Sequence, residues 1–109
     1  MKIAVVGSRK ITNVNLEAYI PKNALEIVSG GAVGVDSCAA EYAKYKGLRL
    51  TEFLPRYESF GRVAPILRNK EIVDYADKVI IFWDSSSRGT KSVIEYTRKI
   101  GKEFELIIL

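Results

Sequence analysis

Residues 24–36 read ALEIVSGGAVGVD, and this stretch decides how the chain is expected to fold. Its first part, 24–28, is short and apolar and predicts a buried β-strand, while residues 35–45 are rich in helix formers. Glycines between a strand and a helix are typical of anion-binding loops, because they let the backbone approach a ligand and the helix offers free N–H groups. The alternative is that Gly30, Gly31 and Gly34 only form a tight turn. One glycine would be enough for that, so we favour phosphate binding.

The composition is that of an ordinary globular protein. The chain has 109 residues, 48% of them hydrophobic and 28% charged, and we expect one domain spanning residues 1–109. Its net charge of +4 fits a ligand that carries phosphate. The basic residues are scattered, however, and ordinary solvation of the surface explains most of them.

Residue types that are missing exclude several functions. There is no histidine, which removes Ser-His-Asp and Cys-His catalysis and argues against a zinc site, so we expect neither a metal nor a cofactor. The single cysteine, Cys38, cannot form an intramolecular disulfide, which fits a reducing compartment, and it is expected to act as a small buried apolar side chain. The apolar run at residues 3–6 is too short for a signal peptide or a membrane span. A cytoplasmic protein is therefore expected.

Hydrophobic patterning predicts alternating strands and helices. The expected strands are 2–7, 24–28, 48–54, 78–84 and 104–109; the expected helices are 13–20, 35–45, 64–75 and one that follows the 84–90 loop and ends at Ile100. Right-handed crossovers between them give an α/β fold with a doubly wound parallel sheet of five strands in the order 3-2-1-4-5 and about four helices.

That strand order predicts one ligand site. The loops after the first, second and fourth strands lie beside the switch point of the sheet and should converge on one crevice. They carry Gly7, Ser8 and Arg9 in the first loop, residues 29–36 in the second and residues 84–90 in the third. A further loop, 56–62, contains two arginines and two aromatic residues; it either folds over a ligand or is a solvated connection.

Polar side chains in these loops have defined expected roles. Ser8 and Ser29 can donate hydroxyl hydrogen bonds to a phosphate, and Arg9 either holds a phosphate or caps the surface. Asp36 is expected to lock the glycine loop through backbone N–H groups, with a contact to a ribose hydroxyl as the alternative. Trp83 either stacks on a base or packs at the edge of the sheet.

Two further positions have open interpretations. Arg68 is the best candidate for a charged contact to a ligand, because its planar fork suits phosphate; the alternative is a surface salt bridge with Glu71 or Asp74. Gly89 and Thr90 either hold a second phosphate or the ribose, or form a simple helix N-cap.

The motifs together resemble the SLOG superfamily of Rossmann-like nucleotide-binding proteins, and most closely its small YspA-like members. The resemblance covers nearly the whole chain and is carried by residues 6–9 (VGSR), residues 29–36, Arg68-Asn69, Ala76-Asp77 and Gly89-Thr90. It implies a nucleotide or nucleotide-derived phosphorylated ligand at the carboxyl ends of strands one, two and four. Asn69 enters the candidate site through this resemblance.

Two branches of that superfamily imply different functions. The lysine decarboxylase-like phosphoribohydrolases share the features of Arg68 and of Gly89-Thr90, but Asn69 replaces their lysine and Val93 stands where they have a catalytic glutamate. Without that carboxylate we expect little N-glycosidic hydrolysis of nucleoside monophosphates, and no catalytic residue is assigned. The DNA processing protein A branch shares the pattern of residues 29–36 and binds single-stranded DNA. Single-stranded DNA binding and the N-glycosidase activity of the first branch are the two alternative functions.

Self-association is also expected. A five-stranded sheet in so small a domain leaves little area to cover both faces, and relatives in the superfamily are commonly dimers. Ile66, Ile72 and Val73 on the third long helix, 64–75, mark the expected surface.

Overall fold

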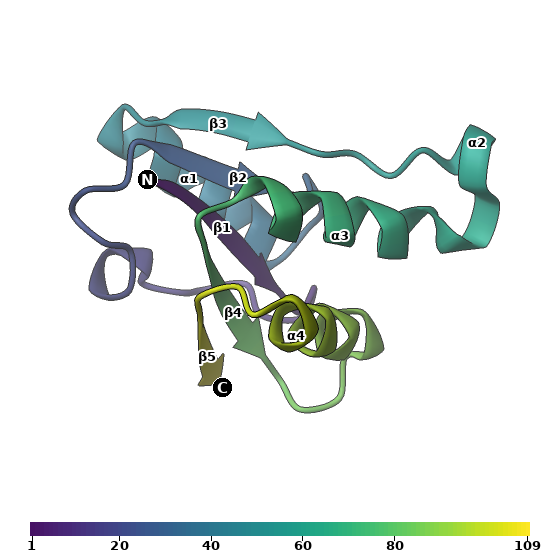
Figure 1. Cartoon of the computed structure of the whole chain (residues 1–109). Helices are drawn as coiled ribbons and strands as arrows, with labels where there is room; N and C mark the ends of the chain where they lie inside the picture. Colours follow the sequence, from purple (N-terminus) through teal and green to yellow (C-terminus); the bar gives the residue numbers. More distant parts are fainter.

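The five strands form one parallel sheet in the order β3-β2-β1-β4-β5, in a computed structural model that describes all residues, 1–109 (Figure 1). The expected fold class and strand order are therefore confirmed. The strands are β1 (Lys2–Gly7), β2 (Glu26–Ser29), β3 (Arg49–Glu52), β4 (Lys78–Trp83) and β5 (Phe104–Ile108). The neighbours of β1 come from distant parts of the chain, because Ala4 aligns with Val28 of β2 and with Val79 of β4.

Helices cover both faces of this sheet. In Figure 1, α1 (Val35–Lys46) lies behind it, and α3 (Ala64–Tyr75) and α4 (Arg88–Ile100) lie in front. Three shorter elements are the 3₁₀ turns η1 (Leu16–Ala18) and η2 (Gly61–Val63) and the single-turn helix α2 (Tyr57–Phe60). No helix combines the length and the apolar character needed to cross a bilayer.

Alternation along the inner strands fills a hydrophobic core on each side of the sheet. In β1, Ile3 and Val5 join the core beneath α1, whereas Ala4 and Val6 join the core beneath α3 and α4. Successive side chains of a strand point to opposite faces, so a strand that is apolar throughout must be covered on both. The continuous apolar runs of β1 and β4 follow from this requirement.

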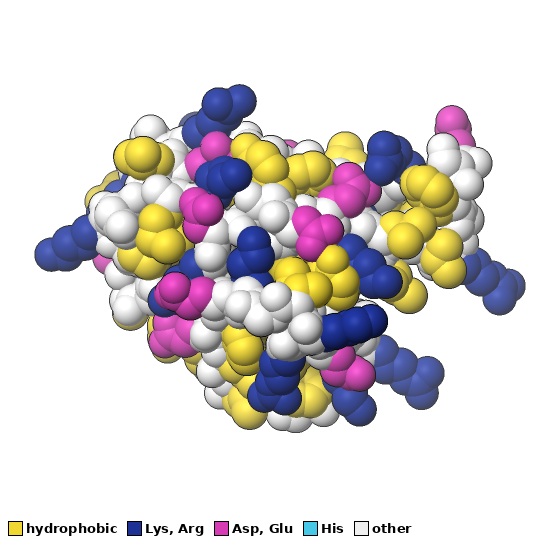
Figure 2. Space-filling view, in the orientation of Figure 1, with side chains coloured by type: hydrophobic (Ala, Val, Ile, Leu, Met, Phe, Trp, Pro, Cys, Tyr) yellow, Lys and Arg dark blue, Asp and Glu magenta, His cyan; other side chains and the backbone are white.

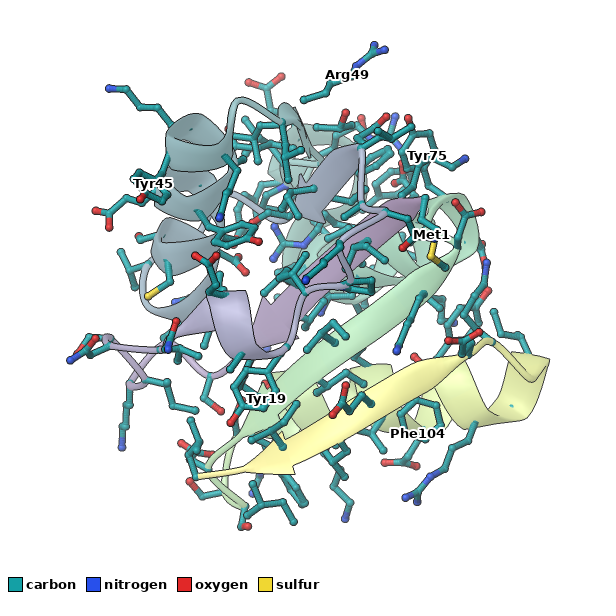
Figure 3. The ribbon with its side chains drawn as sticks, turned by 90° about the vertical axis from the view of Figure 1, so that its left-hand side faces the viewer. Met1, Tyr19, Tyr45, Arg49, Tyr75 and Phe104 are labelled. Carbon is teal, nitrogen blue, oxygen red and sulfur yellow. The ribbon has the colours of Figure 1, made fainter.

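The expected first helix, 13–20, is wrong. Between β1 and β2 the chain makes only the one-turn η1, and the side chain of Asn15 at its start forms no capping hydrogen bond. Residues 12–15 (TNVN) are poor helix formers and Pro21 follows soon after, so tertiary packing decides the conformation. Leu16 and Ile20 are buried, and the Tyr19 ring meets the Phe82 ring edge-on with centroids 5.3 Å apart; Figure 3 shows Tyr19 beside β4 and β5.

Other boundaries also differ from expectation. β3 is shorter than the predicted 48–54 and, as an edge strand, is largely exposed; Figure 3 shows Arg49 projecting away from it. The expected loop 56–62 contains α2 and most of η2, which lead directly into α3. α4 begins at Arg88, so residues 88–90 form its first turn. α1 and α4 end at Gly47 and Gly101, which both have the left-handed φ that glycine favours, 68° and 71°.

The apolar residues of α3 do not form the expected exposed surface. Ile72 and Val73 are buried against the sheet, and only Ile66 is exposed. Exposed apolar side chains instead surround α2, where Figure 2 shows hydrophobic atoms gathered with lysine and arginine at their margins. We call this the α2 surface and define it by Leu54, Tyr57, Phe60, Val63 and Ile66.

Val93 tests the packing of α4 directly. Its side chain is 2% exposed and belongs to the core beneath α3 and α4, so Val93→Glu would bury a carboxylate with no partner. We expect this substitution to lower the free energy of unfolding by about 3 kcal/mol or more. Denaturation in urea measures the loss. Leu25→Glu, at an exposed position outside the α2 surface, is the matched control and should stay within about 0.5 kcal/mol of the native chain. Equal losses in the two variants would contradict the packing described.

Candidate ligand-binding site

One cavity opens at the carboxyl ends of β1, β2 and β4. It has a volume of about 440 Å³, and its walls come from the loops after these three strands and from α3. The loops that were expected to converge therefore do so. The lining residues are Val6, Gly7, Ser8, Arg9, Lys10, Gly30, Ala32, Asp36, Pro65, Arg68, Asn69, Ile72, Asp84, Ser86, Ser87, Gly89 and Thr90.

Most of the residues singled out from the sequence line this cavity. They are Gly7, Ser8, Arg9, Gly30, Asp36, Arg68, Asn69, Gly89 and Thr90. Three of the set lie outside its walls. Ser29 is fully buried at the end of β2, and its Oγ accepts a hydrogen bond from the backbone N–H of Gly31, with 3.4 Å between oxygen and nitrogen. Gly31 and Gly34 belong to the glycine loop but do not line the cavity.

Two of the three loop glycines are needed for backbone geometry rather than for access to the cavity. Gly31 has a φ of 68°, and a Cβ there would lie 2.7 Å from the side chain of Leu54. Gly34 has a φ of 77°, and a Cβ there would overlap the carbonyl oxygen of Arg9. The glycine loop can therefore cross the loop after β1 only where it has no side chain.

Arg68 is the residue that holds the cavity wall together. Its side chain is buried, with 8% of the residue exposed, and its Nη1 donates to the carbonyl oxygen of Gly30 at 2.6 Å and to that of Phe53 at 3.2 Å. Its Nε donates to Oδ1 of Asn69 at 2.8 Å. The alternative of a surface salt bridge is wrong, because Glu71 pairs with Arg56 and Asp74 accepts from Tyr96.

Asp36 lies beside Arg68 and fixes the glycine loop. Its Oδ2 accepts from the backbone N–H of Ala32 at 3.1 Å, so the expected locking hydrogen bond is present. Burial raises the pKa of Asp36, and the N–H of Ala32 and the charge of Arg68 act in the opposite direction. Burial also lowers the pKa of Arg68, against the effect of Asp36. The two opposite charges thus compensate one another behind Gly30, where a Cβ would lie 2.7 Å from Nη1 of Arg68.

The loop after β4 is organised by Asp84. Its Oδ1 accepts from the backbone N–H groups of Ser86 at 3.0 Å and Ser87 at 2.8 Å. These bonds, with the nearby hydroxyls of Ser8 and Ser86, lower the pKa of Asp84 to about 2, so the carboxylate is ionised at neutral pH. The N–H of Asp84 donates to Oγ of the buried Ser8 at 3.3 Å, which links the loops after β1 and β4.

Ser87 forms the N-cap of α4. Its Oγ accepts from the N–H of Thr90 at 3.3 Å, so Thr90 lies in the first turn and is not itself the cap. The indole of Trp83 donates to the carbonyl oxygen of Ser87 at 3.0 Å and packs against the core beneath α3 and α4. Of the two interpretations of Trp83, packing is the one that the structure supports, because its ring does not line the cavity.

The cavity offers several donors suited to an anion. Arg9 and Lys10 are exposed at its wall and form no salt bridge within the chain, so both are free to contact a ligand. The backbone N–H groups of Gly30 and Gly89 form no hydrogen bond within the chain, and both residues line the cavity. Gly89 lies in the first turn of α4, where the helix dipole favours negative charge.

Reasoning from the sequence missed Lys10 and Pro65, and it predicted the loop that carries Ser86 without singling out that residue. Lys10 follows the SR of residues 8–9 directly, and this adjacency was the signal that could have found it. Pro65 and Ile72 come from α3, and only the packing of that helix against the glycine loop brings them to the cavity.

Some groups with possible chemistry lie elsewhere. Val93 and Glu95 on α4 do not line the cavity, so the position that matches the phosphoribohydrolase glutamate faces the core. Asp36 and Asp84 are the carboxylates at the wall. No group of three or more Cys, Asp or Glu side chains is placed to hold a metal ion.

Fold and site together define a Rossmann-like α/β protein with an anion-suited cavity at the switch point of its sheet. Among known families, residues 1–51 match that of DNA recombination-mediator protein A. This segment contains β1, β2, the glycine loop and α1, and it ends within β3. Arg68 and the loop after β4 lie beyond the match. No curated protein and no solved structure matches the chain.

Replacing Arg68 tests its role in the cavity wall. Arg68→Met would leave the carbonyls of Gly30 and Phe53 without their donor and Asp36 without its compensating charge. We expect the free energy of unfolding to fall by about 3 kcal/mol, measured by urea denaturation in the absence of ligand.

The matched control is Arg62→Met, because the exposed Arg62 makes no hydrogen bond or salt bridge. It should change the free energy of unfolding by less than about 0.5 kcal/mol. If Arg68→Met lowered the free energy of unfolding by no more than this control does, the guanidinium would not stabilise the cavity wall.

Proposed function

We propose that the cavity binds a nucleotide or nucleotide-derived ligand through its phosphate. The observation that supports this most strongly is the meeting of Arg9 and Lys10 with the free N–H groups of Gly30 and Gly89 in one cavity. Charged side chains and unpaired backbone N–H groups are the donors that phosphate oxygens need.

Size and position also support a small ligand. A volume of about 440 Å³ lies in the range of small-molecule sites, and the cavity opens at the switch point of the sheet. Basic side chains extend from the loop after β1, while the loop after β4 offers hydroxyl groups. A ligand that spans the cavity would therefore meet cations and neutral donors on different sides.

We expect binding rather than N-glycosidic hydrolysis. The phosphoribohydrolase glutamate is replaced by Val93, which is in the core, and Oδ1 of Asp84 is occupied by backbone N–H groups. No carboxylate therefore stands at the position that the glutamate occupies in the phosphoribohydrolases.

Binding is tested with AMP, CMP, GMP and UMP, the four nucleosides and ADP-ribose, by thermal shift and then calorimetry. The phosphorylated compounds should bind, and the nucleosides should bind more weakly. Arg9→Glu should weaken the tightest of them about tenfold or more, because a charge-assisted hydrogen bond is replaced by repulsion.

Lys22→Glu makes a comparable charge reversal on an exposed loop away from the cavity and is the control. It should leave the affinity within about twofold of the native value. If no phosphorylated compound stabilises the native chain, or if Arg9→Glu binds as well as the native chain does, the proposal is wrong.

Single-stranded DNA is the second candidate, and the family match over residues 1–51 favours it. The α2 surface adds exposed Tyr57 and Phe60, with the Arg56 guanidinium 5.5 Å from the Phe60 ring centroid. Aromatic and basic groups of this kind bind single strands by stacking and charge. Tight, salt-dependent binding of a labelled oligonucleotide, without binding of mononucleotides, would favour this candidate over the first.

Self-association remains part of the proposal, with its surface moved from the buried face of α3 to the α2 surface. Burying those apolar side chains in a second copy would remove them from water. We expect a species of twice the 12.2 kDa monomer mass in light scattering at micromolar concentration, and Phe60→Glu should shift it to monomer. A native chain that is monomeric throughout would contradict this.

A further inference from the structure

We infer that Asp84 makes the cavity selective for ribose, accepting a hydrogen bond from a hydroxyl of the ligand's sugar and so distinguishing ribonucleotides from deoxynucleotides. This inference rests on the proposed function and names the chemical class of its ligand. It starts from a carboxylate in a cavity otherwise suited to anions.

The two carboxylates at the cavity wall have different surroundings. Asp36 is buried behind Gly30, and its charge is compensated by Arg68. Asp84 forms no salt bridge, and backbone N–H groups donate to its Oδ1 only. Its Oδ2 accepts no backbone hydrogen bond. The remaining donors near this carboxylate are the hydroxyls of Ser8 and Ser86, which can rotate away to admit a donor from a ligand in the cavity that Asp84 lines.

A ligand that binds beside an ionised carboxylate is favoured if it brings a hydrogen-bond donor for that carboxylate in addition to its own anionic group. Inorganic phosphate is an anion at neutral pH, so its charge is repelled by Asp84. A sugar phosphate carries hydroxyl donors a few atoms from its anionic group, so Arg9 and Lys10 can take the phosphate while Asp84 takes a hydroxyl. The hydroxyls of Ser8 and Ser86 lie near Asp84 and can rotate to form further hydrogen bonds with the same sugar.

Asp84→Asn isolates this contact. An asparagine Oδ1 still accepts from Ser86 and Ser87, so the loop keeps its hydrogen bonds, while Oδ2 is replaced by an amide that donates. Affinities are measured by calorimetry for the tightest-binding ribonucleoside monophosphate, its 2′-deoxy and 3′-deoxy analogues and inorganic phosphate.

For the native chain we expect at least one deoxy analogue to bind about tenfold or more weakly than the ribonucleotide, because a charge-assisted hydrogen bond is lost. In Asp84→Asn that ratio should fall to about twofold. Asp77→Asn is the matched control: Oδ2 of Asp77 accepts from the N–H of Lys2 at 2.7 Å at the opposite end of the sheet, so the ratio should not change.

The outcomes separate this inference from the proposed function. If the ribonucleotide and both analogues bind equally tightly to the native chain, the ribose contact is wrong and phosphate binding stands. If the native ratio is large but survives in Asp84→Asn, another residue reads the sugar and the assignment to Asp84 is overturned. If no nucleotide binds, both proposals fail.

Discussion

The hydrogen bond from the buried guanidinium of Arg68 to the carbonyl oxygen of Gly30 is the interaction on which the site depends. It joins α3 to the end of β2, and the same nitrogen also reaches Phe53 after β3. With Asp36 held to Ala32 beside it, the glycine loop is fixed from two directions. Arg68, which the sequence marks as a candidate ligand contact, therefore stabilises the packing of α3 against the glycine loop. This role places it at the cavity wall.

Close backbone packing imposes a second constraint. A side chain at Gly34 would overlap the carbonyl of Arg9, and one at Gly7 would lie 2.5 Å from Val35. The loops after β1 and β2 can approach each other only through these positions. That approach brings the cation of Arg9 to the same cavity as the N–H of Gly30. The glycine pattern thus fixes how two loops pack, and the suitability for an anion is a consequence of that packing.

The strand order and most of the cavity-lining residues could be predicted, because apolar periodicity and the alternation of strands with helices leave few topologies. The helix at 13–20 could not, since burial of Leu16 and Ile20 decides the conformation there. Nor could the different environments of Asp36 and Asp84, which depend on α3 and on the turn at residues 84–87. Local sequence predicts which segments form strands and helices, but it does not determine which side chains a distant helix will bury.

The walls of the cavity come from residues as far apart in the chain as Gly7, Arg68 and Thr90. No fragment that lacks α3 or α4 can assemble them, including the segment 1–51 that matches a known family. Occupancy of the site is thereby linked to the integrity of the whole sheet. A bound molecule would slow the exchange of amide protons with solvent in β1 and β4 as well as near the site. The unfolding motions that expose those strands also disrupt the cavity, so binding makes them less frequent.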